Sequence, residues 1–516
     1  MIRSSVTRMA FAAALLAPAS LPAQGPEGPL WDSYRRAAEV VRLAAEAHGG
    51  VEAVRGLNAA SFRWEGQDYA PTQGRIPSVS WDTAGNARAA MLDVRIDYAR
   101  SRFVTDREAR FGGGYLNASR LAGNGREFLS YNPAAERGMG GVTFSRDTTG
   151  TTARRFLASA GLNLPVLAIR AAMGRASTLR HLGTVERGGR REEAVAFSTA
   201  EGDPVTLYFD AETHLLTRRE EMGAGSLGDE VDATIYSDYA TMDGFRVPRA
   251  LELRWNGVLT GRQRLAHFRA SADLPDSLFA VPAGYTAAVP PAPLGSVRLS
   301  ERVAYIERIN GSYRSLVVDT DEGLLVVDAP LSAEFSEAAI REIEKVFPGR
   351  PFRWLVLTHH HGDHIGGVQA YVARGATVLA AAGSEPYLRR MTRITRGFGR
   401  IGGQAAAVAE PRIEGVTGRR SFPAGGSRVE VINVGPTSHA AAMLAVYVPS
   451  ERLLFQGDLL RINEGSGPVM SPEATRDLDA IIRRFRLDVA NIGAVHGMNG
   501  TMDDLRAALR KAETLR

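Results

Sequence analysis

The chain has 516 residues, of which 44% are hydrophobic and 23% charged, so its composition is that of an ordinary globular protein with room for two or three domains. Its formal charge of +5 rests almost wholly on arginine, because Lys345 and Lys511 are the only lysines, and we expect no nucleic-acid partner. The lack of cysteine excludes disulfides, thiolate metal ligands and a cysteine-linked lipid anchor.

The first 23 residues are typical of a secretory signal peptide. Arg3 and Arg8 precede an apolar run over 9–16, and small residues follow around Ala19 and Ala23. The apolar run is too short to cross a bilayer, so we expect no transmembrane segment, cleavage after Ala19 or Ala23, and a soluble protein exported to the periplasm. Cleavage removes two arginines and no acids, which lowers the formal charge from +5 to +3.

Residues 24–285 are predicted to form a β-rich domain that opens with a helix. The helix covers 31–48, where alanine, valine and leucine recur at helical spacing up to Gly49 and Gly50. Segments of alternating apolar and polar residues then indicate a large antiparallel sheet, which a helical patch at 153–174 interrupts.

A proline-rich, uncharged stretch at 286–296 is predicted to be a linker between domains. Beyond it, over 297–516, strands and helices alternate, which is typical of a mixed α and β domain. The predicted fold class is therefore α+β, with a β-rich antiparallel-sheet domain followed by a second domain that contains both helices and strands.

A histidine cluster follows the predicted strand at 353–358. Its H-x-H-x-D-H array consists of His359, His361, Asp363 and His364. Imidazole and carboxylate suit zinc or another borderline divalent ion, and four such ligands exceed what one catalytic zinc with an open position needs. The array therefore indicates two metals. The side chain of His360 is expected to point away, either supporting a neighbour or facing solvent.

Three further strand ends supply donors of the same kind. His439 follows the predicted strand at 429–435, Asp458 follows the strand at 453–456, and His496 follows the strand at 491–495. A solvated, histidine-rich loop is the alternative interpretation of the array alone, but it does not account for the three additional strand ends. We therefore expect all seven residues to meet at one edge of the domain.

The motifs THHHGDH, GPTSH, GDLL and VHG together resemble those of the metallo-β-lactamase-fold hydrolase superfamily, over about residues 297–514. This resemblance implies an αββα sandwich with two zinc ions at one edge of its sheets, iron or manganese being the alternatives. It also implies the ligands: His359, His361 and His439 for the first metal, Asp363, His364 and His496 for the second, and Asp458 as the bridge. Asp328 resembles an early aspartate that supports such a site.

Two positions depart from parts of that superfamily. Many β-lactamases have cysteine or serine where this chain has Asp458, so the chain is more similar to the thioesterase, lactonase, sulfatase and phosphodiesterase branches. Ala440 stands where a hydroxyl residue commonly follows the histidine.

The segment at 24–285 resembles, more faintly, periplasmic domains of the outer-membrane lipoprotein-sorting type, and an accessory domain without a ligand is an equal alternative.

The sequence thus predicts an exported dinuclear zinc hydrolase for a small-molecule substrate, with an ester, thioester, lactone, amide or phosphoester bond as the target. A metal-bridging hydroxide is the expected nucleophile, and Asp363 is the expected catalytic residue that orients it. Two alternatives remain open: a periplasmic carrier whose N-terminal domain binds an apolar ligand beside a structural metal domain, and an iron-dependent redox enzyme. The arginine-rich segment at 387–404 is interpreted as a solvated helix face in preference to a substrate grip.

Overall fold

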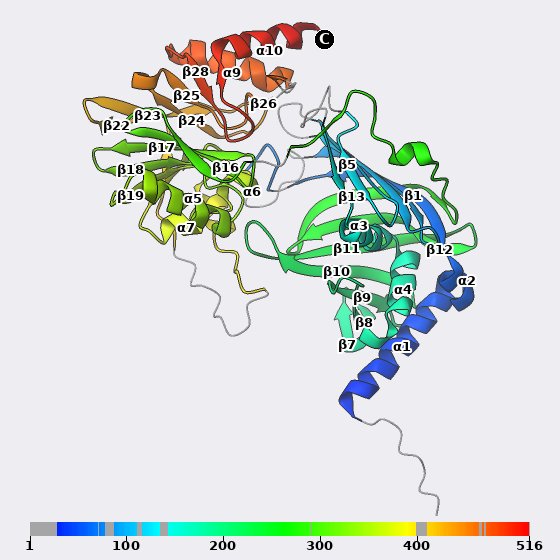
Figure 1. Cartoon of the computed structure of the whole chain (residues 1–516). Helices are drawn as coiled ribbons and strands as arrows, with labels where there is room; N and C mark the ends of the chain where they lie inside the picture. The colour runs from blue at the N-terminus through cyan, green and yellow to red at the C-terminus, as the bar shows by residue number, and fades with distance from the viewer. Residues whose placement is uncertain are drawn as a thin grey trace, which may run out of the picture.

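The structure is a computed structural model that describes residues 28–70, 72–77, 87–110, 116–134, 143–289, 292–398, 410–463, 467–468 and 471–514. The predicted signal peptide lies outside these residues. A β-rich N-terminal domain and a mixed C-terminal domain stand beside each other (Figure 1). Over the described ranges, none of the helices combines the length and the apolar character needed to cross a lipid bilayer.

The N-terminal domain is built on one sheet of 14 strands, in the order β14-β6-β5-β4-β3-β2-β1-β13-β12-β11-β10-β9-β8-β7. Its strands are β1 (Ala59–Asp68), β2 (Arg88–Asp97), β3 (Arg102–Arg110), β4 (Leu116–Gly123), β5 (Phe128–Tyr131), β6 (Thr143–Asp147), β7 (Arg180–Arg187), β8 (Arg190–Ser198), β9 (Pro204–Asp210), β10 (Leu216–Ala224), β11 (Asp229–Met242), β12 (Phe245–Trp255), β13 (Val258–Arg269) and β14 (Thr286–Ala287). Only the short β14 pairs in parallel, with β6. The antiparallel sheet expected from the alternating pattern is confirmed.

Four helices share one hydrophobic core with this sheet. They are α1 (Pro29–Ala47), α2 (Val51–Gly56), α3 (Thr151–Gly161) and α4 (Pro165–Gly174). Val40 and Val41 of α1 and Leu167 of α4 are buried with Phe62 and Trp64 of β1. Because alternate residues of a strand face opposite sides of a sheet, the first half of β1 buries every second side chain against the helices. Both predicted helical regions are confirmed.

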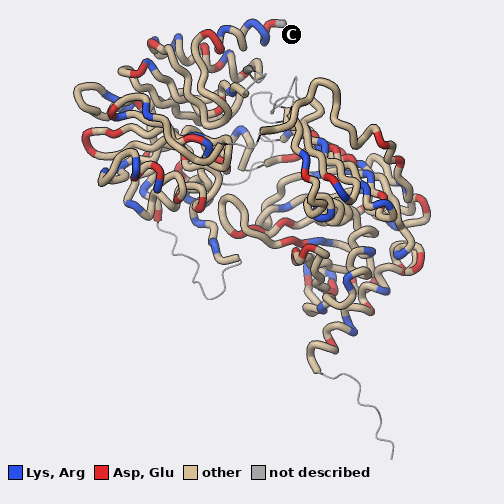
Figure 2. The backbone as a smooth tube through the Cα atoms, in the orientation of Figure 1, with Lys and Arg blue, Asp and Glu red and all other residues tan. Residues whose placement is uncertain are grey.

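The outer surface of the N-terminal sheet carries charges of both signs. Figure 2 shows basic and acidic residues interleaved along its strands. Arg63 contacts Asp93 across β1 and β2, and Arg120 contacts Asp106 across β4 and β3. Such cross-strand pairs each contribute between a few tenths of a kcal/mol and about 1 kcal/mol to the free energy of unfolding. They therefore help to fix the strand register more than they stabilise the sheet.

The C-terminal domain contains two sheets. The seven-stranded sheet has the order β15-β16-β17-β18-β19-β20-β21, and the six-stranded sheet has the order β22-β23-β24-β25-β28-β29. The first comprises β15 (Gly295–Arg298), β16 (Val303–Ile309), β17 (Tyr313–Thr320), β18 (Gly323–Val327), β19 (Phe352–Val356), β20 (Thr377–Ala381) and β21 (Ile413–Val416). The second comprises β22 (Arg419–Ala424), β23 (Ser427–Gly435), β24 (Met443–Val448), β25 (Leu453–Phe455), β28 (Asn491–Gly493) and β29 (Gly500–Thr501). A separate ribbon consists of β26 (Ile462–Asn463) and β27 (Gly467–Pro468).

The two sheets face each other across one core, and helices cover their outer faces. In β17, Leu316 and Val318 lie in the core between the sheets, whereas Val317 lies in the core beneath the helices. The helices over the first sheet are α5 (Ala333–Val346), α6 (Gly362–Ile365), α7 (Val368–Val372) and α8 (Glu385–Met391), and those over the second are α9 (Pro472–Phe485) and α10 (Met502–Thr514). The buried, continuously apolar strands are explained by this position between two layers, and the expected αββα sandwich is confirmed.

Candidate metal centre

Strand ends from both sheets meet at one edge of the sandwich. His359 follows β19, and the short α6 then carries Asp363 and His364. On the second sheet, the loops after β23, β25 and β28 carry His439, Asp458 and His496. The polypeptide leaves each buried strand at the same edge, so donors that are far apart in the sequence become neighbours.

The side chains of these residues converge on a small volume. His359 Nε2 lies 3.1 Å from His439 Nε2. Asp458 Oδ2 lies 3.3 Å from His364 Nε2, 3.3 Å from His496 Nε2 and 3.6 Å from His439 Nε2. Asp363 Oδ2 lies 3.2 Å from His496 Nε2. The structure thus brings together the residues that the sequence singled out.

Three overlapping groups of donors have ligand atoms within 4.8 Å of one another: His359, His361 and His439; His359, His364 and Asp458; and Asp363, His364 and His496. Asp458 shares a group with one histidine from each of the other two groups. Nitrogen and carboxylate donors at this spacing suit divalent cations such as zinc.

The ring nitrogens that do not face the centre are held by protein oxygens. Buried Asp328 accepts hydrogen bonds from the Thr358 hydroxyl at 2.7 Å and from His364 Nδ1 at 3.0 Å. The oxygen of Thr358 can then accept from His359 Nδ1, which is 3.1 Å away. With Nδ1 protonated in both histidines, Nε2 presents its lone pair to the centre, which is the arrangement that metal-binding histidines need.

The third histidine of the array is held by the other domain. His361 Nε2 donates to the backbone carbonyl of Gly74, 3.0 Å away, which leaves Nδ1 for the centre. Gly74 belongs to the loop between β1 and β2 of the N-terminal domain. The same loop places Gln73 Nε2 2.6 Å from Asp363 Oδ1. Sequence reasoning missed both residues, because no motif near position 73 signals a contact nearly 300 residues away.

A pocket of about 150 Å³ opens onto the centre. Besides the donors, its lining includes Gln73, Ser312, Tyr313, Leu460 and Arg461. The Tyr313 hydroxyl donates to Asp363 Oδ2 at 3.2 Å, and its ring packs edge-on against His496 with centroids 4.5 Å apart. Tyr313 lies at the start of β17 and was not predicted, because a tyrosine at a strand end is also common in ordinary cores.

Burial and mutual charge set the ionisation of the centre. Burial lowers the pKa of His359, and the neighbouring histidines lower it further. Burial opposes the charging of His364, but the carboxylates around it outweigh burial and raise its pKa well above the usual value. Burial likewise raises the pKa of Asp363, yet His364 and His496 bring it well below its usual range. Ionised carboxylates and a neutral His359 are the forms that bind divalent cations, whereas His364 must release the proton that the carboxylates favour before its Nε2 can act as a ligand.

Tight turns hold the donors that follow β23 and β25. Thr437 Oγ1 accepts hydrogen bonds from the backbone N–H groups of His439 and Ala440 at 3.2 and 3.1 Å. A hydroxyl two residues before the histidine therefore serves this turn, although position 440 lacks one. Gln456 Oε1 accepts from the backbone of Leu459 at 2.6 Å and closes the turn around Asp458.

The structure also decides the roles of two features next to the centre. His360 is buried, so the solvent-facing alternative is wrong; burial lowers its pKa to about 3, and its ring packs edge-on against Tyr387. Residues 399–404 of the arginine-rich segment lie outside the described residues. Arg389 of α8 and Arg393, just beyond the end of that helix, pair with Glu410 at half-exposed positions, as expected for a solvated surface. Arg396 instead donates to backbone carbonyls of Ser226 and Gly366 and joins the two domains.

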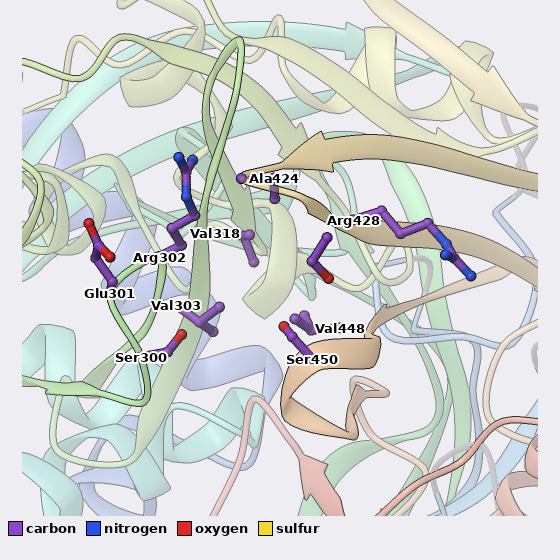
Figure 3. Close-up of a pocket in the computed structure, with 11 residues that line it drawn as sticks. Ser300, Glu301, Arg302, Val303, Val318, Ala424, Arg428, Val448 and Ser450 are labelled. Carbon is purple, nitrogen blue, oxygen red and sulfur yellow. The ribbon is translucent and has the colours of Figure 1, made fainter.

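A second pocket, of about 210 Å³, lies elsewhere in the sandwich. Figure 3 shows Val303, Val318 and Val448 in its lining, with Glu301 and Arg428 at opposite sides. It is larger than the pocket at the histidines, but its lining contains no histidine or aspartate. Donor chemistry, and not volume, therefore identifies the candidate site.

Comparison with known proteins agrees with this geometry. Residues 310–496 match the model of the metallo-β-lactamase superfamily. The chain is 27% identical to the 2,4-dinitroanisole O-demethylase subunit alpha of Nocardioides sp. (strain JS1661), over 29% of this chain and 42% of that one. It is 37% identical to the linear primary-alkylsulfatase of Pseudomonas sp. (strain ATCC 19151), over 11% of each chain. It is 24% identical to the type 2 metallo-β-lactamase of Bacillus sp. (strain 170), over 39% of this chain and 72% of that one.

The aligned part spans less than half the length of the first two of these relatives. All of the sequence motifs that carry the resemblance lie in the C-terminal domain, and the matched segment begins after β16 and ends at His496. The resemblance of the N-terminal domain to lipoprotein-sorting proteins has no counterpart in this match and stays a prediction. The C-terminal domain of this chain is a metallo-β-lactamase superfamily domain.

Proposed function

We propose that the chain is an exported, metal-dependent hydrolase that acts on a small molecule. In this proposal His359, His361 and His439 hold one divalent ion, and Asp363, His364 and His496 hold a second. Asp458 would be shared by the two sites, and we expect both ions to be zinc. The division into a signal peptide at 1–23, domains at 24–285 and 297–516, and a linker at 286–296 is part of the same proposal. The ends of that linker belong to the sheets, because β14 (Thr286–Ala287) pairs with β6 and β15 (Gly295–Arg298) pairs with β16, which leaves 288–294 between the domains.

One observation carries the proposal. The His359 and His439 nitrogens face each other at 3.1 Å, while Thr358 and Asp328 occupy the other nitrogens of His359 and His364. In a histidine cluster that only fills space, the ring nitrogens are not expected to converge on one point. A structural zinc would close four ligands around a single ion, whereas this centre presents seven donors beside a pocket.

The seven donors would hold two divalent ions, whose chemistry would be to activate a water molecule near neutral pH and to polarise the bond under attack. The protein contributes the remaining steps. Asp363 orients the attacking water and accepts its proton on a carboxylate oxygen. Burial and the nearby Asp363 and Asp458 raise the pKa of Tyr313, so its hydroxyl stays protonated and continues to donate to Asp363.

The pocket has room for only the reacting end of a small substrate. Its volume of about 150 Å³ is below the roughly 300–1,000 Å³ typical of sites that enclose a whole ligand, so the rest of the molecule extends outward. Arg461 at the wall favours a substrate with a negative charge near the scissile bond. The relatives are named for an O-demethylase, an alkylsulfatase and a β-lactamase, and sulfate esters therefore join the esters, thioesters, lactones, amides and phosphoesters to be tested.

The test is turnover of a panel of these substrates by the mature protein, with and without a chelator, together with elemental analysis. We expect two zinc ions per chain and chelator-sensitive hydrolysis of one substrate class. His439→Ala and Asp458→Ala should lose metal and at least about a hundredfold in activity, because each removes a donor, while the far-UV circular dichroism stays unchanged.

His267→Ala, which removes a histidine of β13 in the other domain, is the matched control and should behave as wild type. An Asp458→Ala protein that is metal-free yet fully active would overturn the assignment. Iron with an intense visible absorption, in place of zinc, would favour the redox alternative.

A further inference from the structure

The β1–β2 loop of the N-terminal domain lies directly on the histidine array. The backbone of Thr72 accepts from Gly362 N–H at 2.8 Å, and the backbone of Gly74 accepts from His361 Nε2 at 3.0 Å. Gln73 Nε2, between them, donates to Asp363 Oδ1 at 2.6 Å. Three consecutive residues thus contact three consecutive residues of the motif. The loop forms part of the wall of the centre.

This position is held by contacts on both sides of the loop. Arg75 Nε donates to the Thr437 carbonyl at 3.0 Å, and the Arg75 carbonyl accepts from Ala441 N–H at 2.7 Å, on the turn that carries His439. A second N-terminal segment, between β10 and β11, inserts Leu227 into the core of the C-terminal domain. There Asp229 accepts from the backbone N–H groups of Gly397 and Phe398 at 2.6 and 2.9 Å.

The contact of Gln73 restrains the carboxylate of Asp363. Oδ1 receives the Gln73 amide, and Oδ2 faces the Tyr313 hydroxyl at 3.2 Å and His496 Nε2 at 3.2 Å. Only the amide nitrogen of glutamine can donate, so its orientation follows from the carboxylate opposite. With both oxygens engaged, rotation of the carboxylate about its bond to the chain is hindered, and Oδ2 is directed at His496 and His364.

We propose that Gln73 is a positioning residue of the metal centre, through which the N-terminal domain sets the orientation of Asp363. The proposal rests on the proposed function insofar as Asp363 is a metal ligand. It assigns the β-rich domain a role in the active site, in addition to any ligand of its own. Because the Gln73 amide is neutral, the negative charge of Asp363 remains available to a cation. An arginine at position 73 would neutralise that charge.

The test is a titration of the metal-free full-length chain with Zn²⁺ against a chromophoric chelator, and with Co²⁺ followed by visible absorption. Gln73→Met keeps the length of the side chain and removes the donor. Since partners of metal ligands typically contribute about 10- to 100-fold in metal affinity or activity, one of two binding steps should weaken by that factor and the Co²⁺ spectrum should change. Where a substrate is known, kcat should fall and KM should stay nearly constant.

Gln67→Met makes the same substitution in β1 at an exposed position whose side chain contacts only Tyr69 among the described hydrogen bonds, and it should match wild type throughout. Gln73→Glu is a second variant of equal length that sets a carboxylate against Asp363, and it should weaken the same step. If both variants at position 73 bind two ions with wild-type affinity and spectrum, the proposal is wrong.

The proposed function can fail separately. Wild-type protein that binds two ions but hydrolyses no member of the panel would contradict the hydrolase assignment, while the titrations would still decide the role of Gln73. Wild-type protein that binds no metal would overturn both.

Discussion

The buried carboxylate of Asp328 shows how single residues organise the centre. It accepts from the Thr358 backbone and hydroxyl, both at 2.7 Å, and from His364 at 3.0 Å. Its φ of 62° lies in the left-handed region, which costs about 1 kcal/mol or more outside glycine but is tolerated best by Asp and Asn. Three hydrogen bonds offset that cost. The aspartate was expected to support the site, and the hydrogen bonds give the physical means.

A second buried residue, His48, is expected to make the N-terminal domain sensitive to acid. Its ring is fully buried at the end of α1, where Nδ1 contacts the Ala44 carbonyl at 2.8 Å. Burial lowers the pKa of His48 to about 4 from an ordinary value of 6.5. Between these two pH values His48 is protonated in the unfolded chain and neutral in the folded chain. The free energy of unfolding should therefore fall by up to about 3 kcal/mol as pH drops from about 6.5 to about 4.

Urea denaturation of wild type and His48→Gln across this pH range measures the effect. Glutamine keeps a donor for Ala44 and does not titrate, so the variant should show a smaller loss of stability on acidification, whatever its stability at neutral pH. Parallel pH profiles for the two proteins would contradict the assignment.

A single glycine in the turn that follows β25 allows the two sheets of the C-terminal domain to approach each other closely. Gly457 has φ of +74°, and a Cβ there would lie 2.9 Å from Thr358 Oγ1 and 3.1 Å from Thr358 Cβ. Thr358 in turn holds Asp328 and His359. Side-chain bulk at position 457 would therefore press on the residue that orients the array.

We expect Gly457→Ala to destabilise the protein and to weaken metal binding. Gly435→Ala is the control, because Gly435 has a similar φ of +76° and a methyl group there would meet nothing within 4 Å. Both variants carry the left-handed backbone penalty of about 1 kcal/mol, but only Gly457→Ala should also lower Zn²⁺ affinity, by about tenfold or more. Equal Zn²⁺ affinity in the two variants, measured by the chelator competition, would show that Thr358 yields without consequence.

The candidate metal centre joins the two sheets of the C-terminal domain and the N-terminal domain. His359, Asp363 and His364 follow the seven-stranded sheet, His439, Asp458 and His496 follow the six-stranded sheet, and Gln73 and Gly74 come from the N-terminal domain. A cation bound here would tie the two sheets together directly, and the N-terminal domain through the hydrogen bonds of Asp363 and His361. Since ligands that bind only the folded state stabilise it, metal should raise the melting temperature of the whole chain.

Zinc at about a hundred times its dissociation constant contributes about 2.7 kcal/mol, which corresponds to a rise of roughly 5–10 °C for a domain of this size. Differential scanning calorimetry of the zinc-loaded and chelated protein measures it. Asp458→Ala should abolish the shift, and a shift of the same size in that variant would place the stabilising zinc elsewhere.

Local signals in the sequence predicted much of this molecule. Helical spacing marked α1, and alternation marked the antiparallel sheet, because side-chain periodicity follows directly from backbone geometry. The strand ends before His359, His439, Asp458 and His496 were readable for the same reason. At the start of α10, Thr501 and Asp504 each accept a hydrogen bond from the backbone N–H of the other, a local capping arrangement that depends only on two residue types three positions apart.

Contacts between distant segments were decided by tertiary structure alone. Residue type and short-range spacing were enough to predict the kinds of elements, the αββα class through its motifs, and the set of donors to be brought together. The placement of Gln73 on Asp363, of Gly74 on His361 and of Tyr313 beside His496 depends on how two folded domains dock and how strands enter the sheet. Such docking is set by the summed shape and polarity of large surfaces, which no short stretch of sequence encodes.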